Sequence, residues 1–338
     1  MKWDFAIGNP AYQEPKDDTS DKPVYNYFMD EAQKIADKVE MITPARFLFN
    51  AGKTPKAWNE KMLHDRHFKV MYYEPIADNV FSNTEIKGGV AISYRDSSRD
   101  FGEIGTFTKH SELNDIIKKV ASSSENKSLC EIMYQQSKFE LPKLYKKHPE
   151  YKNKIGSEGK ERRLTTPIFE QLEIFKNKAE NGDDIQIIGL VKNIRKNKYV
   201  ARMFIEQTES LDKYKVLLSA SGGAGHLGET ISQPIIAGPN TGFTQSFVGL
   251  GLFNSENEAL NAVKYVKSKF ARVLLGVLKV TQHAHKDVWA YVPLQDFTDK
   301  SDINWNASIA DIDQQLYKKY GLSQEEIDFI ETHVKEMA

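Results

Sequence analysis

The order of apolar and amphipathic segments in the first hundred residues constrains the fold of this chain more than any other feature. Four short apolar runs, typical of strands, are interspersed with two stretches that have helical spacing. The strands are predicted at 3–8, 39–42, 68–73 and 88–94, and the helices at 25–37 and 54–64. The second helix is expected to open with a Thr54 cap and Pro55 in its first turn. This alternation predicts an α/β fold with a mostly parallel sheet that carries helices on its faces.

A polar, charge-dense stretch at 95–109 predicts a boundary between two domains. We therefore divide the 338 residues into a first domain at 1–110 and a second at 111–338. Short strand patterns, one of them at 199–204, dominate from residue 184 onward, and long helix patterns close the chain. This mixture predicts an α+β second domain.

Composition limits the classes of function. With a net charge of −1 the chain has no overall attraction to a polyanion, so any nucleic-acid binding must come from a local concentration of lysine and arginine. The single cysteine, Cys130, excludes an intramolecular disulfide and a cysteine-rich zinc site. No run approaches the roughly 20 apolar residues of a membrane span, and no signal-peptide pattern is present. These features predict a soluble, cytoplasmic protein without a membrane partner.

The string that carries chemistry is an apolar strand that ends in Asn-Pro-Ala-Tyr. Residues 4–12 read DFAIGNPAY. In an open parallel sheet, ligands bind beyond the carboxyl ends of the strands, which is where this tetrapeptide would lie. The Asn9 side-chain oxygen and the Pro10 backbone oxygen can accept both hydrogens of an exocyclic amine, which favours a pyramidal nitrogen whose lone pair points at an electrophile. Proline fixes its backbone angle, so its carbonyl is presented rigidly.

Tyr12 follows these two acceptors and can lie against the face of a base drawn out of a duplex. Such stacking contributes about 1–3 kcal/mol per base. The plainer interpretation of the same residues is a strand followed by an asparagine-proline turn with a packed tyrosine. Four residues alone do not decide between the two interpretations.

The segment resembles the strand and NPPY catalytic loop of amino-methylating DNA methyltransferases, specifically those of fused restriction-modification enzymes. Further segments are similar to later parts of that family and follow in the same order. They read VEMITPARFL at 39–48, VMYYEP at 70–75, NVFSNTEIKGGVAI at 79–92, TQSF at 244–247, KFAR at 269–272, VPLQDF at 292–297 and DQQLYKKYGL at 313–322. The resemblance therefore covers essentially the whole chain.

The resemblance implies a restriction-modification protein that transfers a methyl group from S-adenosylmethionine to adenine N6 in double-stranded DNA. It implies that Asn9 and Pro10 hold the amine, and that Tyr12 and Phe81 sandwich the flipped base from opposite faces. The fold that it implies is a partial Rossmann-like methyltransferase sheet at 1–110, followed by a mixed α+β DNA target-recognition domain at 111–338.

Two departures from the family pattern matter. Ala11 stands where the family has a second proline, which removes a rigid ring but neither proposed acceptor. The family's cofactor strand and glycine loop precede the catalytic loop, so the residues that bind S-adenosylmethionine are unknown here. We expect the second half of a seven-stranded sheet, with apolar surface exposed at 3–8, in an enzyme that is truncated or needs a partner chain for its cofactor half.

A dense glycine cluster at 221–228 lies far downstream of the catalytic loop and lacks the lysine and serine or threonine of a phosphate loop. It predicts a flexible or DNA-approaching loop instead.

Basic residues with interspersed aromatics gather at 138–163, 192–202 and 264–279. A charge run is usually a solvated face, but the family places target recognition after its catalytic half. We favour the middle cluster for DNA. Its predicted contacts to phosphates are made by Lys192, Arg195, Lys198 and Arg202.

Other chemistries remain open as alternatives. Asp78 with Glu85 and Lys87 resembles the acid, acid-x-lysine spacing of metal-dependent nucleases, which would suit a restriction endonuclease component. His283 and His285 alternate at strand spacing, but no third ligand lies near, so no metal site is predicted. The second alternative is a non-catalytic DNA-binding specificity subunit or fragment. The sequence does not determine the recognition site, the oligomeric state or whether the chain is active alone.

Overall fold

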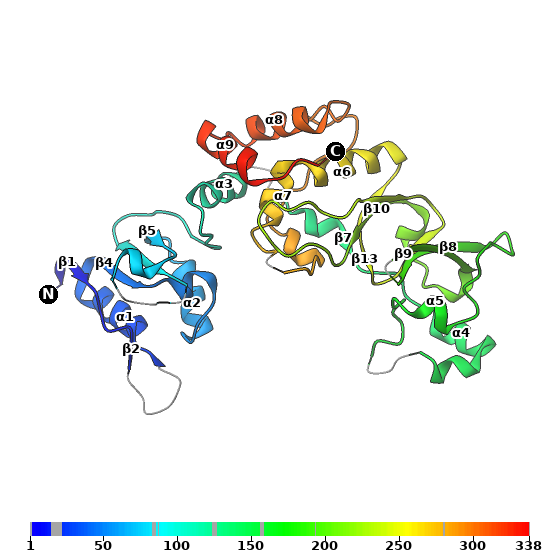
Figure 1. Cartoon of the computed structure of the whole chain (residues 1–338), viewed down its shortest axis with the longest axis horizontal. Coiled ribbons are helices and arrows are strands. Elements are labelled where there is room, and N and C mark those ends of the chain that lie inside the picture. Colours follow the sequence, from blue (N-terminus) through cyan, green and yellow to red (C-terminus); the bar gives the residue numbers. More distant parts are fainter. Residues whose placement is uncertain are drawn as a thin grey trace. The chain divides into compact units, whose positions relative to one another are not determined.

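A computed structural model describes residues 2–14, 22–82, 86, 88–123, 127–155, 159–192, 194–279 and 281–337. The chain forms two compact units, Met1–Asn114 and Asp115–Ala338 (Figure 1). Both units contain helices and strands, and the chain has several separate sheets. This mixture is consistent with the predicted α/β class.

The first unit contains a four-stranded sheet in the order β1, β4, β6, β5. Its strands are β1 (Trp3–Gly8), β4 (Ala36–Pro44), β5 (Phe68–Glu74) and β6 (Val90–Asp96), which confirms the four predicted strands. β1 pairs parallel with β4, whereas β6 runs antiparallel to β4 and to β5. The expectation of a mostly parallel sheet is therefore wrong for these strands. A loop rather than a crossover helix joins β5 to β6, so β6 returns in the opposite direction.

Two helices cover one face of this sheet. They are α1 (Tyr25–Ile35) and α2 (Lys56–Leu63). Apolar side chains from both helices pack against β4, β5 and β6, with the Phe47 and Trp58 rings 5.2 Å apart in the same cluster. The predicted Thr54 cap is wrong, because Pro55 occupies the N-cap position and the Thr54 hydroxyl donates to Asn59 Oδ1 at 2.7 Å instead.

The opposite face carries exposed apolar side chains from β1. Trp3, Phe5 and Ile7 are 71%, 43% and 76% exposed, whereas Ala6, which points to the other face, packs against the helix-covered core. β1 is also an edge strand, since β4 is its one partner among the described residues of the sheet. The predicted apolar surface at residues 3–8 is confirmed.

The second unit contains an antiparallel sheet in the order β11, β10, β13, β7. Its strands are β7 (Met133–Tyr134), β10 (Tyr214–Ser219), β11 (Ile235–Ala237) and β13 (Phe247–Phe253). Helix α6 contacts three of these strands, and α7 contacts the two closing helices. The helices of this region are α3 (Ser111–Ala121), α6 (Glu256–Lys267), α7 (Lys269–Leu275), α8 (Ile309–Lys319) and α9 (Gln324–His333).

A second sheet in this unit joins β12 (Thr241–Phe243), β8 (Asp184–Val191) and β9 (Ile194–Ala201) in that order. One of its faces packs with the short helices α4 (Leu141–Lys147) and α5 (Ile168–Gln171) in an apolar cluster. The strand predicted at 199–204 is wrong in its bounds, because β9 begins at Ile194 and residues 202–204 form a 3-10 turn. Cross-strand pairing with β8 overrides the polar composition of residues 194–198.

The glycine cluster at 221–228 is not a free loop. The Glu229 carboxylate accepts hydrogen bonds from the Ala224 and Gly225 amides at 2.8 and 3.1 Å and pairs with buried Lys279. Gly228 has a positive φ of 70° and lies so close to the C-terminal segment that an added Cβ would come 2.3 Å from the His333 carbonyl oxygen. The end of the cluster is therefore anchored, and close backbone packing explains Gly228. The approach of this segment to DNA stays a prediction, and Ser221, Gly223 and Ala224 are exposed.

Within the described part of the chain, no helix combines the length and the apolar character needed to cross a bilayer.

Candidate functional site

The Asn-Pro-Ala-Tyr segment leaves the sheet at the carboxyl end of β1. Asn9 is exposed and Pro10 is half-buried, directly after Gly8, which pairs with Met41 of β4. The side-chain amide of Asn9 and the carbonyl of Pro10 therefore lie at the sheet edge, where a ligand can approach them. This is the position that the sequence predicts for them.

Tyr12 is held more tightly than its neighbours. Its carbonyl accepts a hydrogen bond from the Val24 amide at 3.1 Å, and the following short strands β2 (Gln13–Glu14) and β3 (Lys22–Pro23) pair antiparallel. The ring packs at the margin of the apolar core, and burial raises the pKa of its hydroxyl. That hydroxyl is buried without a hydrogen-bond partner among the described residues. Tyr12 therefore combines a fixed backbone with an unsatisfied polar atom.

Phe81 lies in the loop between β5 and β6. β5 runs parallel to β1 and β4, because both β4 and β5 are antiparallel to β6. The carboxyl ends of β1, β4 and β5 consequently share one edge of the sheet, and the loops that carry Tyr12 and Phe81 both start there. Two strands separate β1 from β5, which corresponds to about 14 Å at the usual strand spacing. The structure places both aromatics at one edge but does not bring their rings into contact.

The pairing of β4 with β6 continues one residue past the end of β4. The Ala45 amide donates to the Gly89 carbonyl at 3.0 Å, and Gly88 packs against the Arg46 side chain. The last residues before β6 are therefore fixed beside the end of β4. Phe81 itself is half-buried, with its amide donating to the Ala77 carbonyl at 2.8 Å.

A pocket of about 500 Å³ in this unit lies at the other edge of the sheet. Its lining includes Lys2, Asp30, Lys34 and Arg95, which stand before β1, late in α1 and late in β6. It is therefore remote from Asn9.

The predicted DNA-contacting cluster forms the far half of a β-hairpin. Val191 pairs with Ile194 across a two-residue turn in which Lys192 has a positive φ of 52°. Arg195 and Lys198 both lie on β9, but they project from opposite faces because side chains alternate along a strand. The Lys198 ammonium donates to Asn177 Oδ1 at 2.6 Å, whereas Lys192 and Arg195 are exposed. The predicted cationic cluster is thus split between two faces and the turn.

Arg202 is engaged at the root of the hairpin. Its guanidinium binds both carboxylate oxygens of Asp212, at 2.8 and 2.6 Å, and donates to Asn240 Oδ1 at 2.7 Å. The hydrogen bond from Arg202 lowers the pKa of Asp212. This geometry fastens the end of β9 to the segment before β10.

The basic cluster at 264–279 is largely internal. Arg272 is 1% exposed and donates to backbone carbonyls, Lys264 donates to the Trp305 carbonyl at 2.6 Å, and Lys269 pairs with Glu331. These cations hold α6 and α7 to the closing segments. The sequence therefore overstated the cationic surface of the second unit.

Lys196 and Asn197 lie in the basic stretch predicted to bind DNA, but the sequence analysis did not name them as individual contacts. Both are exposed on β9 next to Arg195, and no described residue makes a side-chain hydrogen bond or ion pair with them. The sequence does indicate a cationic segment here, since no acidic residue occurs from Ile185 to Ile205. Without a strand predicted at 194–198, the sequence did not show which of these side chains share a face.

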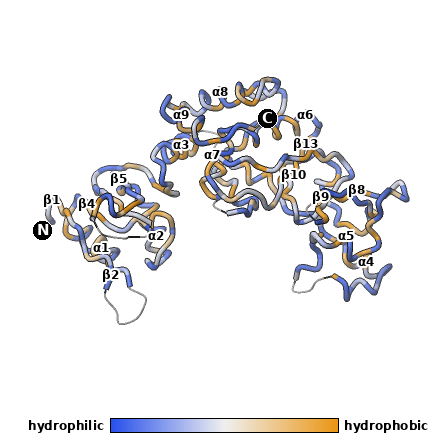
Figure 2. Tube along the Cα trace, in the orientation of Figure 1, coloured by the Kyte–Doolittle hydropathy of each residue, from blue (hydrophilic) through white to orange (hydrophobic). Residues whose placement is uncertain are grey.

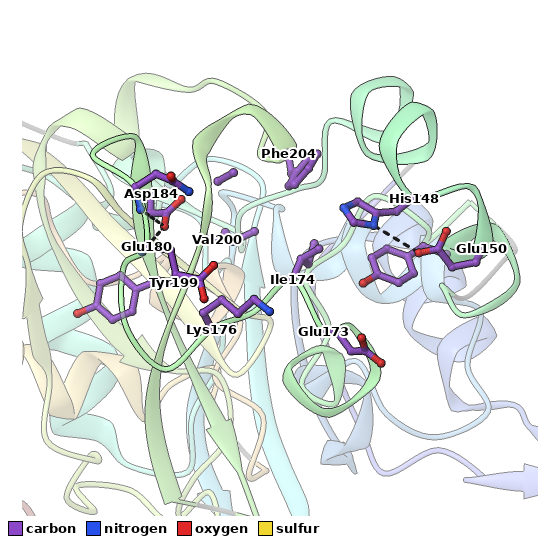
Figure 3. A pocket seen from close by; sticks show the side chains of 13 residues that line it. His148, Glu150, Glu173, Ile174, Lys176, Glu180, Asp184, Tyr199, Val200 and Phe204 are labelled. Carbon is purple, nitrogen blue, oxygen red and sulfur yellow. Dashed lines mark hydrogen bonds and ion pairs between the residues drawn. The ribbon is translucent and has the colours of Figure 1, made fainter.

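A pocket of about 320 Å³ lies beside the root of β9 (Figure 3). His148 and Glu150 stand on one side of it, 3.3 Å apart, and Asp184 and Tyr199 on the other. Glu173 and Glu180 also line it, so its walls carry four carboxylates against one lysine, Lys176. The root of the hairpin is therefore acidic, in contrast to its tip.

The residues of the alternative chemistries are only partly described by the structure. Asp78 is exposed in a 3-10 turn, and Glu85 and Lys87 lie outside the described residues. The His283 and His285 rings stack with centroids 5.7 Å apart. In the described part of the chain no group of three metal-ligating side chains converges.

Comparison with known families gives a match within the first unit. No curated protein matches the chain. The family model described as Eco57I restriction-modification methylase matches residues 1–81, a segment that runs from β1 through the Asn-Pro-Ala-Tyr loop to Phe81. The first 81 residues therefore carry the sequence pattern of a restriction-modification methylase.

Proposed function

We propose that this chain is the catalytic-loop and DNA-recognition part of an adenine-N6 DNA methyltransferase in a restriction-modification system. The observation that carries the proposal is the position of Asn9 and Pro10. They follow a strand at the carboxyl edge of a sheet, inside the segment that matches a restriction-modification methylase. Two exposed or half-buried carbonyl oxygens at such an edge suit an exocyclic amine.

Asn9 and Pro10 act on the amine of the target base. The adenine N6 lone pair is delocalised into the ring, and two fixed hydrogen-bond acceptors favour its localisation on nitrogen. The backbone of the loop supports this role, because β1 pairs with β4 on one side and the Tyr12 carbonyl is tied to the Val24 amide on the other. The acceptors are therefore held between two anchored points, which compensates for alanine at position 11.

Tyr12 and Phe81 bind the flipped base in this proposal. Their loops share a sheet edge, but two strands separate their starting points, so the loop of Phe81 has to move toward Asn9 when a base enters. The Tyr12 hydroxyl is buried without a hydrogen-bond partner among the described residues. A rearranged loop or a ligand would supply this partner. Stacking between the two rings offsets the cost of removing the base from the duplex.

The methyl donor of the family is S-adenosylmethionine. The free edge of β1 and the exposed Trp3, Phe5 and Ile7 support docking of another polypeptide segment. We propose that this segment adds a strand to β1, covers the exposed apolar face and brings the cofactor-binding residues. Edge strands with large apolar side chains are otherwise prone to aggregation.

In the second unit, the hairpin of β8 and β9 supplies DNA contacts through Lys192, Arg195 and Lys198, and the two lysines suit phosphates. The Arg202 guanidinium is occupied by Asp212 and Asn240, so we propose that it contributes by fixing the root of the hairpin. Backbone contacts of this kind position a duplex without reading its sequence.

The test is a map of N6-methyladenine in the genome of cells that carry the native locus, which keeps any partner segment present. We expect a methylated motif that disappears in Asn9→Ala and persists in the matched control Asn306→Ala, an exposed asparagine of the second unit. An unchanged methylation map in Asn9→Ala would overturn the proposal.

The separation of the Tyr12 and Phe81 loops by two strands favours one alternative, a non-catalytic specificity subunit that only binds DNA. In that case purified chain binds a defined sequence, while no adenine methylation at the native locus depends on Asn9. The same two measurements therefore separate the alternatives.

A further inference from the structure

The tip of the β8–β9 hairpin consists of two strands alone, whereas at its root another segment pairs with each of the two strands. β12 pairs with β8 along Gln186–Ile188 and no further. On the outer side, Lys176 bridges to Tyr199 of β9. Lys192 and residues 194–197 are exposed at this end, whereas Gly189 is buried and Leu190 and Val191 pack against the apolar clusters. Figure 1 shows this end of the hairpin projecting past α5.

The dimensions of this tip suit the major groove of DNA. From Ile194 to Asn197 the exposed part of β9 spans about 10 Å at the strand rise. The groove is about 12 Å wide and admits a two-stranded ribbon that lies along it. Figure 2 shows that the tip is mostly hydrophilic.

Charge is distributed unevenly along the hairpin. Lys192, Arg195 and Lys196 lie at or next to the turn, while the pocket at the root is lined by four carboxylates that include Glu180 and Asp184. A duplex lying along the whole hairpin would meet these carboxylates. Insertion of the tip places the cations against phosphates and keeps the acidic root away from them.

The two faces of the tip differ in chemistry. Arg195 and Asn197 share one face, because they pair with Leu190 and Ile188 of β8. The other face carries Ile194, Lys196 and Lys198, and Lys198 is occupied by Asn177. Arginine and asparagine can form bidentate hydrogen bonds with guanine and adenine edges, respectively, whereas lysine acts as a point charge that suits a phosphate.

We propose that the hairpin tip enters the major groove and that Arg195 and Asn197 determine the recognition sequence, Arg195 by binding a guanine and Asn197 an adenine. The inference rests on the proposed function, since it takes duplex DNA as the substrate. Two residues along a strand span about 6.8 Å. This equals about two steps of 3.4 Å along a DNA strand, so the two bases are about two positions apart.

The test is selection of binding sites from a randomised duplex library by the full purified chain. Wild type should enrich a consensus sequence. Arg195→Ala should lose the preference for guanine at one position, and Asn197→Ala the preference for adenine about two positions away. Each loss should weaken binding to the wild-type consensus by about 5- to 150-fold, which corresponds to 1–3 kcal/mol.

The matched control is Lys196→Ala, the neighbouring exposed residue on the other face. It should weaken binding to all sequences alike, retain the consensus and reduce the salt slope by about one. Thermal unfolding of all three variants checks that the fold is kept.

A consensus that is unchanged in both Arg195→Ala and Asn197→Ala overturns this inference and leaves the proposed function standing. Failure of wild type to enrich any sequence overturns DNA recognition by the chain, and with it both proposals. Selection does not require methyl transfer, so an inactive catalytic loop does not affect it.

Discussion

The Asp313 carboxylate of α8 accepts a 2.9 Å hydrogen bond from the Phe270 amide in the first turn of α7. The neighbouring Lys269 amide donates to the other oxygen of the same carboxylate at 3.0 Å. Asp313 therefore satisfies two amides that the helix leaves unpaired at its N-terminus. It also joins two of the segments, 269–272 and 313–322, that carried the family resemblance.

Asp313 should make the stability of the second unit depend on pH. Burial raises the pKa of its carboxyl from 3.8 to about 6, even though the two amides act in the opposite direction. The folded state therefore holds this proton more tightly than the unfolded state, and the contribution to stability falls as pH rises from about 4 to 6. We expect wild type to lose about 3 kcal/mol of unfolding free energy from this site across that window.

Asp313→Asn keeps an acceptor oxygen but removes the titration. Urea unfolding of both proteins at pH 4, 5, 6 and 7 gives the comparison, and the stability of wild type relative to the variant should decrease with pH. A difference that stays constant from pH 4 to 7 would contradict the assignment.

Arg202 and Asp212 should stabilise the root of the hairpin as a pair. Asp212 is 56% exposed, so solvent screening limits their coupling to about 0.5–1 kcal/mol in a double-mutant cycle of Arg202→Ala and Asp212→Ala. Because the guanidinium is already engaged, Arg202→Ala should leave the salt slope of DNA binding unchanged. A reduced slope would show instead that Arg202 contacts a phosphate directly.

Removing Lys192, Arg195 and Lys198 together should weaken binding to any duplex. Each lost phosphate contact lowers the salt slope by about 0.9, so the loss of the two lysines in the triple alanine variant should lower the slope by about 2. Binding isotherms at several salt concentrations measure this. Equal affinity and slope in wild type and variant would remove the hairpin from the DNA interface.

Tyr12 and Phe81 should change the environment of a flipped adenine. A duplex with 2-aminopurine at the target position should brighten on binding, because fluorescence rises when the base leaves the stack. An aromatic sandwich partly quenches this signal, so Phe81→Ala should be brighter than wild type. No change with either protein at a confirmed recognition site would speak against base flipping by this chain.

The purified chain alone should transfer no labelled methyl groups to mixed-sequence DNA. Under the proposed function another polypeptide segment brings the cofactor-binding residues, and positioning of the donor supplies much of the rate enhancement that proximity allows. Calorimetric titration should likewise show no binding of S-adenosylmethionine. Micromolar cofactor binding together with Asn9-dependent methylation by the isolated chain would refute this expectation.

Local patterns in the sequence were sufficient to predict the strand and helix on either side of the Asn-Pro-Ala-Tyr loop. The apolar run at 3–8 and the Asn-Pro that follows it set the end of β1, because proline cannot continue the pairing of the strand. The helix at 25–35 followed from its amphipathic spacing. Exposure of Trp3 and Ile7 followed from the resemblance to half of a larger sheet.

Only the tertiary structure decided the direction of β6 and which lysine and arginine side chains are paired with other residues. Strand direction depends on whether a connection crosses over the sheet or returns beside it, which residue types do not encode. The sequence identified Asn9, Pro10 and the basic stretch at 192–202, since these depend on residue type alone. Partners distant in the chain determine which cations face solvent, such as Asp212 for Arg202 and Asn177 for Lys198. The register of the hairpin, which only the structure shows, places Arg195 and Asn197 on one face and the lysines of β9 on the other.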